Sequence, residues 1–268
     1  MAERRAYTPF DRARFQRRLP CGVALGQKLL VLDQTESTQT ALRAELDRLG
    51  SAGRGLIVLA EEQRAGRGRT ARDWWSGPPS ANLAVSVAVH ALPDPVETLG
   101  MHAACALVGA AAPYARGRQL ALKWPNDLLL DGAKFAGLLV EAGLAGGAAL
   151  LGVGVNLREA PPRAVARYPT TRLAPEAWRE DFLARWLLAL DRRLRQAALA
   201  GPGQLERDCL ALLRAWAPHG VDEARSAHRG PLVQFSVHDG LTWGFEGART
   251  TRPLGWIERL EALPAPRA

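Results

Sequence analysis

Lysine and asparagine are nearly absent from this chain. All but three of its 35 basic residues are arginine, and asparagine also occurs only three times in 268 residues. Two of the lysines, Lys123 and Lys134, lie with Asn126 in the segment 123–141, KWPNDLLLDGAKFAGLLVE. Lysine supplies a compact point charge that arginine does not replace. The clustering makes this segment the first candidate for chemistry, against the alternative that each lysine was retained by chance.

Cysteines and long apolar runs are also scarce. Cys21, Cys105 and Cys209 are far apart and form no CxxC pair, so they indicate neither a disulfide framework nor a zinc site. This usage fits a reducing cytoplasm, where we expect the protein to be. No run approaches the roughly 18 consecutive apolar residues of a membrane span, so no membrane association is expected. The first 18 residues contain six arginines and no signal-peptide core. We expect residues 1–20 to form a loose basic arm.

The motifs of several common enzyme classes are missing. There is no GxxxxGK[ST], no GxSxG and no zinc ligand set, and the histidines are isolated, so nothing indicates covalent nucleophilic catalysis. The net charge of +8 and a pI near 10.2 raise the question of nucleic-acid binding. However, the arginines are spread along the whole chain. A positive field also favours anionic substrates such as nucleotides, or an acidic protein partner.

The hydrophobic patterning predicts one large domain and a small appendage. Hydrophobic residues make up 47% and charged residues 23% of the chain, as in ordinary globular proteins. Asp131-Gly132 is a two-residue hairpin signal, and a run of hairpins indicates the α+β class, with a mixed or antiparallel central sheet and flanking helices. Expected strands are 28–33, 56–60, 83–89, 120–124, 128–130, 135–142 and 148–155, and expected helices are 38–49, 95–114, 175–199 and 204–216.

The hydrophobic pattern of the chain changes near Pro218. Short β-like runs at 232–237 and 241–245 surround the turn His238-Asp239-Gly240. We therefore expect a main domain over residues 21–217 and a small C-terminal β unit over residues 218–268.

The segment 62–80 is a long loop in which glycine alternates with arginine. Gly66-Arg67-Gly68-Arg69 provides a mobile backbone and guanidinium groups suited to phosphate or carboxylate, and Trp74 and Trp75 follow. A solvated basic loop and an RNA-binding segment are the alternatives. Because the loop is single and lies between two expected strands, we interpret it as a flap over a site.

The Trp-Pro-Asn-Asp corner is expected to present polar groups between two strands. Pro125 fixes one φ angle and lacks an amide proton, so Asn126 and Asp127 are expected to be presented rather than paired in the ladder. Asp127 suits contact with Mg²⁺ and phosphate, or it caps a turn. Lys134 can reach an anion as a flexible point charge. Gly137 allows a close approach or a bulge, or it simply packs in the strand.

Two further segments carry polar groups. Ser37 and Thr38 precede or begin the first expected helix, where they either cap it or bind a small polar ligand. Residues 152–156, GVGVN, end a strand but have the wrong spacing for a dinucleotide fingerprint.

Taken in order, ESTQ, EEQRAGRGR followed by tryptophan, KWPNDLLLDGAKFAGLLVE and GVGVN resemble the biotin–protein ligases, over residues 28–157. The resemblance implies a class II synthetase-like catalytic fold and an SH3-like or degenerate C-terminal unit. It implies activation of biotin with ATP and Mg²⁺ as biotinoyl-5′-AMP, then transfer to one lysine of a biotin carboxyl carrier protein domain. Lipoate ligases share the fold, but their RRxSGGG-type loop has no counterpart here. A lipoate or octanoate ligase and an arginine-rich nucleic-acid-binding protein remain the alternatives.

The resemblance also implies residue roles. Lys134, Arg69 and Asp127 would be catalytic, and Asp127 would hold Mg²⁺. The biotin-binding residues would be Ser37, Thr38, Gln39, Gln63, Gly66, Arg67, Gly68, Arg69, Lys134 and Gly137, and the ATP-binding residues Arg67, Arg69, Trp74, Asn126, Lys134 and Asn156.

Three features depart from the family or vary within it. Gln39 stands where the family usually has asparagine, and Ala71 stands where the arginine-rich loop usually has glycine. Only about 27 residues precede the first matched strand, so we expect no N-terminal DNA-binding domain. A homodimer through the central sheet, common in the family, is left open.

Overall fold

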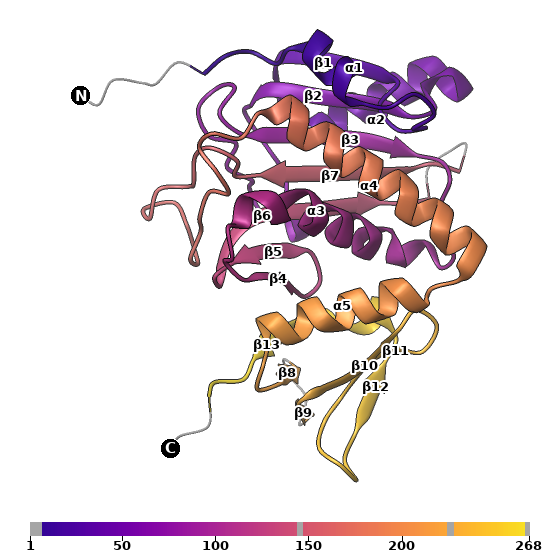
Figure 1. Cartoon of the computed structure of the whole chain (residues 1–268), viewed down its shortest axis with the longest axis vertical. Coiled ribbons are helices and arrows are strands. Elements are labelled where there is room, and N and C mark those ends of the chain that lie inside the picture. Colours follow the sequence, from indigo (N-terminus) through magenta and orange to yellow (C-terminus); the bar gives the residue numbers. More distant parts are fainter. Residues whose placement is uncertain (1–6, 144–146, 224–227, 266–268) are drawn as a thin grey trace.

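The centre of the molecule is a seven-stranded mixed sheet (Figure 1). The computed structural model describes residues 7–143, 147–223 and 228–265. Strands β1 and β2 are parallel and all other neighbouring pairs are antiparallel, which confirms the α+β prediction. Across the sheet the strands are β1 (Lys28–Thr35), β2 (Leu56–Gln63), β3 (Leu83–Val89), β7 (Ala149–Val155), β6 (Ala133–Glu141), β5 (Asp127–Leu130) and β4 (Leu120–Lys123).

The hairpin predicted at Asp131-Gly132 joins β5 to β6. Both residues have positive φ angles, 49° and 75°, as a two-residue hairpin turn of the favoured type requires. From that turn β6 runs antiparallel to β7, and Gly137 lies directly opposite Gly154. This register brings two residues without side chains together on one face of the sheet.

Helices cover both faces of the sheet. The helix α2 (Thr38–Leu49) packs on one face through Leu42, which contacts Val58 and Leu150 in a small apolar cluster. The opposite face carries the main core and is covered by α3 (Leu99–Ala115) and α4 (Arg179–Ala200) (Figure 1). In that core Cys105 and Cys209 are buried with their sulfurs 3.7 Å apart, and all three cysteines are free. Short 3₁₀ turns lie at Gly50–Gly53, Arg69–Ala71, Val96–Thr98 and Leu254–Trp256.

The N-terminal segment corrects the expectation of a loose arm. Residues Arg12–Arg18 form helix α1, whose Asp11 side chain accepts a hydrogen bond from the Arg14 amide. Phe15 is fully buried, and Arg14 forms an ion pair of 2.9 Å with Asp181 of α4. The arginines dominate the composition but face outward, whereas Phe15 anchors the segment. The part of the expected arm that falls on residues 1–6 lies outside the described residues.

A buried ion pair holds the N-terminal segment against the sheet. Arg179 is only 1% exposed and its guanidinium lies 2.7 Å from the Glu61 carboxylate. The second Glu61 oxygen accepts the Phe10 amide at 2.6 Å, and Arg179 also donates to the Thr8 carbonyl. Each charge is therefore compensated, as burial of charged groups requires.

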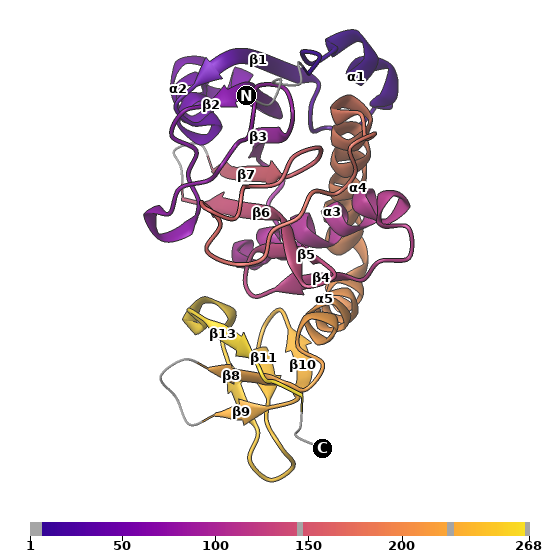
Figure 2. The ribbon, with the colours of Figure 1, turned by 90° about the vertical axis from the view of Figure 1, so that its left-hand side faces the viewer.

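Helix α5 (Gly203–Trp216) packs against the edge strand β4 of the sheet and against β10 of a C-terminal unit of two small antiparallel sheets, which lies below the sheet (Figure 2). Sequence patterning predicted two of these strands and missed the shorter ones, of two or three residues. The boundary at residue 218 stays a prediction. Among the described residues, no helix combines the length and apolar character that a membrane crossing requires. The six strands are β10 (Leu232–Ser236), β11 (Gly240–Trp243) and β12 (Thr250–Arg252) in one sheet, and β13 (Leu260–Ala262), β8 (Val221–Glu223) and β9 (Arg229–Gly230) in the other.

Candidate active site

A cavity of about 650 Å³ lies beside the start of α2, on the helix α2 side of the sheet. Segments far apart in the sequence line it: the loop after β2, the corner between β4 and β5, strands β6 and β7, the loop after β7, and residues 258–260. All the residues predicted for the site line this cavity except Gly66, which packs against the Trp74 carbonyl within the loop. Their individual roles stay predictions.

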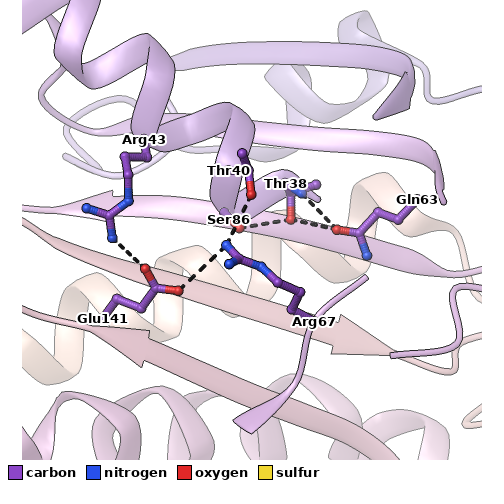
Figure 3. A network of polar contacts seen from close by, with 7 residues as sticks. All are labelled: Thr38, Thr40, Arg43, Gln63, Arg67, Ser86 and Glu141. Atoms are coloured by element: carbon purple, nitrogen blue, oxygen red, sulfur yellow. Dashed lines mark hydrogen bonds and ion pairs between the residues drawn. The ribbon is translucent and has the colours of Figure 1, made fainter. Parts of the chain in front are cut away.

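The start of α2 is held by a chain of hydrogen bonds (Figure 3). Thr38 donates from its amide and its hydroxyl to Gln63 Oε1, at 2.8 and 3.1 Å, and accepts from the Ser86 hydroxyl at 2.9 Å. Gln63 Nε2 donates to Ser76 Oγ at 3.1 Å. Ser37 occupies the N-cap position, but its side chain makes no capping hydrogen bond. The hydroxyl of Ser37 is therefore not used to cap the helix.

Gln39 is a buried amide without partners. Its side chain is 3% exposed, and neither Nε2 nor Oε1 makes a hydrogen bond with any described residue. It packs against Gly152, where an added Cβ would lie 3.0 Å from Gln39 Oε1. An unpaired buried polar group costs about 1–3 kcal/mol. Such a side chain on a cavity wall suits a ligand with both a donor and an acceptor.

The two halves of the loop between β2 and β3 pair with each other through backbone hydrogen bonds. Trp74 N donates to the Gly66 carbonyl and Gly68 N to the Arg72 carbonyl, both at 2.7 Å. At the tip, Thr70 has a φ angle of 52° within the turn Arg69–Ala71. An added Cβ at Gly66 would lie 2.8 Å from the Trp74 carbonyl oxygen, so the close pairing needs glycine there. We call residues 64–76 the flap.

Trp74 lies against the glycines of β6 and β7. A Cβ built on Gly154 would be 2.2 Å from Trp74 Cε2, and one on Gly137 would be 3.2 Å from Trp74 Cζ3. The paired glycines form a flat floor for the indole. Of the alternatives for Gly137, this arrangement favours close approach. The aromatic residue of the flap therefore forms part of the cavity lining.

Lys134 lies on β6, and its side chain lines the cavity. Its Nζ lies 2.6 Å from Asp127 Oδ1 and donates to the Tyr168 hydroxyl at 3.3 Å. Both Lys134 and Asp127 are largely buried, with side-chain exposures of 11% and 18%. The backbone of Lys134 is also fastened, because its amide donates to Pro169 O and its carbonyl accepts from Thr171 N. Lysine and carboxylate are thus a preformed pair in the cavity.

The corner that precedes Lys134 is more tightly paired than expected. Asp127 begins β5 and its backbone lies opposite Lys123 and Gly137, so the expectation of an unpaired position is wrong. Asn126 Nδ2 donates to the Leu138 carbonyl at 2.7 Å, and its own carbonyl accepts the Leu138 amide. The neighbouring strands pair with the backbone on both sides of the corner. The Asp127 side chain lines the cavity, where it pairs with Lys134.

The two flap arginines differ in their surroundings. Arg67 donates to the Thr40 hydroxyl at 3.1 Å and lies 3.9 Å from Glu141, which also pairs with Arg43 at 2.5 Å (Figure 3). Burial lowers the pKa of the Arg69 guanidinium below its ordinary value, and the nearby charge of Asp127 opposes that shift. Arg69 also lines the cavity, near enough to Asp127 for the two charges to interact.

Two residues that sequence reasoning missed support these walls. Asn82 Oδ1 accepts the amides of three successive residues, 157–159, at 3.0–3.2 Å, and its Nδ2 donates to the Ser76 carbonyl at 3.3 Å. It thereby ties the end of the flap to the loop after β7, which carries the second missed residue, Tyr168. Asparagine scarcity was a signal for Asn82, whereas Tyr168 lies in residues 163–169, whose composition is that of an ordinary surface loop. Asn156 donates to the Thr171 carbonyl, and its Oδ1 has no partner among the described residues.

A lysine and an arginine that line one cavity, beside a carboxylate and an aromatic flap, suit the activation of an acidic substrate. The model of the Biotin/lipoate A/B protein ligase family matches residues 31–157. The biotin–[acetyl-CoA-carboxylase] ligase of Mycobacterium tuberculosis (strain ATCC 25618 / H37Rv) is 35% identical over 68% of this chain and 69% of its own length. That of Paracoccus denitrificans is 34% identical over 72% of this chain and 88% of its own length. This chain therefore belongs to the biotin–protein ligase family, which confirms the resemblance seen in its motifs.

A further relative and two solved structures are also similar. The bifunctional ligase/repressor BirA of Escherichia coli (strain K12) is 38% identical over 49% of this chain, a match that spans 41% of that protein. A solved biotin protein ligase from Aquifex aeolicus, in complex with biotin and ATP, has a TM-score of 0.71 at 22% identity and covers 88% of this chain and 100% of its own. One from Leishmania major, in complex with biotinyl-5-AMP, has a TM-score of 0.55 at 21% identity. The match covers 84% of this chain and 98% of that one.

Proposed function

We propose that this chain activates biotin with ATP as biotinoyl-5′-AMP and transfers the biotinoyl group to one lysine of a biotin carboxyl carrier protein domain. The observation that carries the proposal is that Lys134 and Arg69 line one cavity together with Asp127, whose carboxylate pairs with Lys134 at 2.6 Å and whose charge also acts on Arg69. Joining a carboxylate to a phosphate brings two anions together. Fixed cations that face the same space reduce the cost of that approach.

In the first step a biotin carboxylate oxygen attacks the α-phosphorus of ATP. The new oxygen–phosphorus bond forms as the bond to the bridging oxygen breaks, and pyrophosphate leaves with that electron pair. We assign Lys134 and Arg69 to the charge that develops on the carboxylate and α-phosphate. Ser37, Thr38 and Gln63 would hold the biotin ring, and Trp74 would lie beside the adenine.

Asp127 fits a role beside Mg²⁺. Magnesium typically takes one or two carboxylates together with phosphates, and no larger cluster of His, Cys, Asp or Glu that could hold a metal occurs in the described part of the chain. Asp127, a single carboxylate on the cavity wall, matches this preference of magnesium. Bound there, Mg²⁺ would neutralise charge on the triphosphate.

In the second step the neutral amine of the acceptor lysine attacks the acyl carbon. A carbon–nitrogen bond forms, the bond between the acyl carbon and the phosphate oxygen breaks, AMP leaves, and the nitrogen gives up a proton. Asp127 is positioned to assist with that proton. The flap would keep water from the adenylate, which otherwise hydrolyses.

Gln39 supports biotin over lipoate or octanoate. The cyclic urea of biotin offers an N–H donor and a carbonyl acceptor, and the buried Gln39 amide offers the complementary pair. A dithiolane or an alkyl chain offers neither and would leave Gln39 unpaired. At about 1–3 kcal/mol for an unmet buried group, the preference would be roughly 5- to 150-fold.

The decisive experiment incubates the chain with labelled biotin, MgATP and an apo carrier domain. Label on the carrier lysine is expected, and an unlabelled carrier would end the proposal. Offering biotin, lipoate and octanoate separately in the adenylation step tests the ring assignment. The Gln39→Met variant, which keeps an unbranched side chain of similar length but removes the amide, should lose most of the preference for biotin.

Binding of nucleic acid is the alternative from another class. Many arginines are already engaged with acidic neighbours, for example Arg193 with Asp208 and Arg195 with Asp191. A gel shift at low and at physiological salt tests this alternative, since phosphate contacts weaken steeply with salt. We expect weak binding that is lost at physiological salt.

We also propose that β1 is the surface for a homodimer. It is an edge strand of the sheet, whereas the other edge, β4, packs against α5. An unpaired strand edge can accept a second strand. Sedimentation across protein concentration, with and without biotin and ATP, measures this, and a monomer throughout contradicts it. Cytoplasmic location and the lack of a DNA-binding domain stay predictions.

A further inference from the structure

The corner of the cavity around Lys134 is a cage for a lysine ammonium. Lys134 Nζ contacts the Asp127 carboxylate at 2.6 Å and the Tyr168 hydroxyl at 3.3 Å. It also lies 5.3 Å from the Trp74 ring centroid and 5.5 Å from that of Tyr168. Carboxylate, hydroxyl and aromatic faces are the groups that recognise an alkylammonium ion.

Tyr168 attracts more than one cation. Lys123 Nζ lies 5.9 Å from the same ring centroid, so two of the three lysines in the chain place their ammonium groups beside Tyr168. The residue stands at the cavity wall and is 39% exposed, so it can be reached from outside. A partly exposed aromatic face at the mouth of a cavity can receive an incoming ammonium group.

The backbone holds Tyr168 in place independently of the Lys134 side chain. Pro169 O accepts the Lys134 amide and Thr171 N donates to the Lys134 carbonyl, both at 2.9 Å. At the other end of the loop, Asn82 accepts three consecutive amides. The loop that carries the ring is therefore held without any contact from the Lys134 side chain.

Under the proposed function, the Lys134 ammonium would turn toward biotin and the α-phosphate when these anions bind, and away from Asp127 and Tyr168. After Mg²⁺ leaves with pyrophosphate, Asp127 would be a largely buried charge without a cation. Such a charge is unfavourable, so the corner would attract another cation. In the second step the group that must enter the cavity is itself a lysine side chain.

We propose that Tyr168, together with Asp127, binds the side-chain ammonium of the acceptor lysine, in the place that Lys134 occupies here. The bound ammonium loses one proton to solvent before its nitrogen attacks the acyl carbon as the neutral amine. The inference rests on the proposed function and extends it to the recognition of the second substrate. Tyr168 is then a residue of the transfer step alone. It contributes nothing specific to formation of the adenylate.

The test separates the two steps and two kinds of amine. Adenylate is first formed on the protein from biotin and MgATP, and its formation rate is measured. Single-turnover reactions then present Nα-acetyl-lysine, which is cationic at neutral pH, or hydroxylamine, which is uncharged. The variants are Tyr168→Ala and Tyr168→Phe, with Arg163→Ala as the control because it is an exposed residue of the same loop outside the cavity lining.

Tyr168→Ala should slow transfer to Nα-acetyl-lysine by roughly 3- to 30-fold, the range of one cation–π contact. Its adenylation rate and its capture by hydroxylamine should stay near those of the unchanged protein. Tyr168→Phe keeps the ring, so its loss should be smaller, and Arg163→Ala should show none. Unfolding midpoints of all variants confirm that the fold is kept.

Equal losses with both amines, or no loss with either, would overturn the assignment, as would a matching loss in adenylation. That last result would mean that Tyr168 only orients Lys134. If the unchanged protein forms no adenylate, the proposed function itself is wrong. The two failures are therefore distinguishable.

Discussion

Replacing Gly154 with alanine tests whether the glycine floor sets the position of the flap. Gly154 is paired with Ala84 of β3 on one side and Gly137 of β6 on the other, so its backbone cannot shift. Its added Cβ would lie 2.2, 2.4 and 2.7 Å from three atoms of the Trp74 indole. No real contact of that kind is tolerated, and the indole must leave the floor.

The expected cost follows from where Trp74 can go. Overpacking by one methyl group typically costs about 1–3 kcal/mol. Trp74 is only partly buried and belongs to the flap, so the ring can escape by opening the flap rather than by unfolding the sheet. The loss should therefore appear as weaker ligand binding, about 5- to 150-fold for biotin or ATP, with a much smaller change in the unfolding midpoint.

Two measurements check this. Titration calorimetry gives the affinity for biotin and ATP, and limited trypsin digestion reports flap opening because the flap is rich in arginine. Gly109→Ala is the matched control: it lies on α3, where an added Cβ meets nothing within 4 Å. Alanine in a helix interior should leave binding unchanged and raise stability by roughly 0.5–1 kcal/mol.

A double variant refines the result. In a Trp74→Ala background the clash is gone, so Gly154→Ala should add no further loss of binding. Normal affinity in the single Gly154→Ala variant would refute the idea that the glycine floor places the indole. An additional loss in the double variant would show that Gly154 acts on something other than Trp74.

Four other outcomes follow from single contacts. Lys134→Ala should abolish adenylate formation, with a loss of about a hundredfold or more in pyrophosphate exchange, and leave the fold intact. Removing one partner of the buried pair, as in Glu61→Gln or Arg179→Met, should destabilise the protein by about 3–5 kcal/mol in denaturant unfolding. Asn82→Ala leaves three amides without their acceptor, so it should cost at least about 2 kcal/mol in the same assay and raise the KM for biotin. Burial lowers the pKa of His102 to about 4. The unfolded chain therefore binds a proton more readily than the folded protein between about pH 6.5 and 4, so stability should fall across that window as pH decreases, by up to about 3 kcal/mol, and His102→Phe should flatten the profile.

Local patterns were sufficient for the catalytic sheet and its helices. The helix Thr38–Leu49 was predicted with the bounds it has, because its apolar spacing and terminal glycine are both local signals. The hairpin at Asp131-Gly132 was predicted for the same kind of reason. Helix α1 was missed because its arginines outnumber the one buried anchor, Phe15, whose partners lie far away in the sequence. The two- and three-residue strands of the C-terminal unit are too short to carry a periodic signal.

The site divides in the same way. The order of the motifs resembles that of the biotin–protein ligases, and this resemblance predicted that Ser37, Gln63, Trp74, Asp127 and Lys134 belong to one site; all five line the same cavity. The contacts between them could not be predicted in this way. The Gly137–Gly154 register that receives Trp74, the loop that sets Tyr168 over Lys134 and the unpaired amide of Gln39 depend on contacts between distant segments. Such contacts follow from packing and hydrogen bonding across the sheet, which no single stretch of sequence contains.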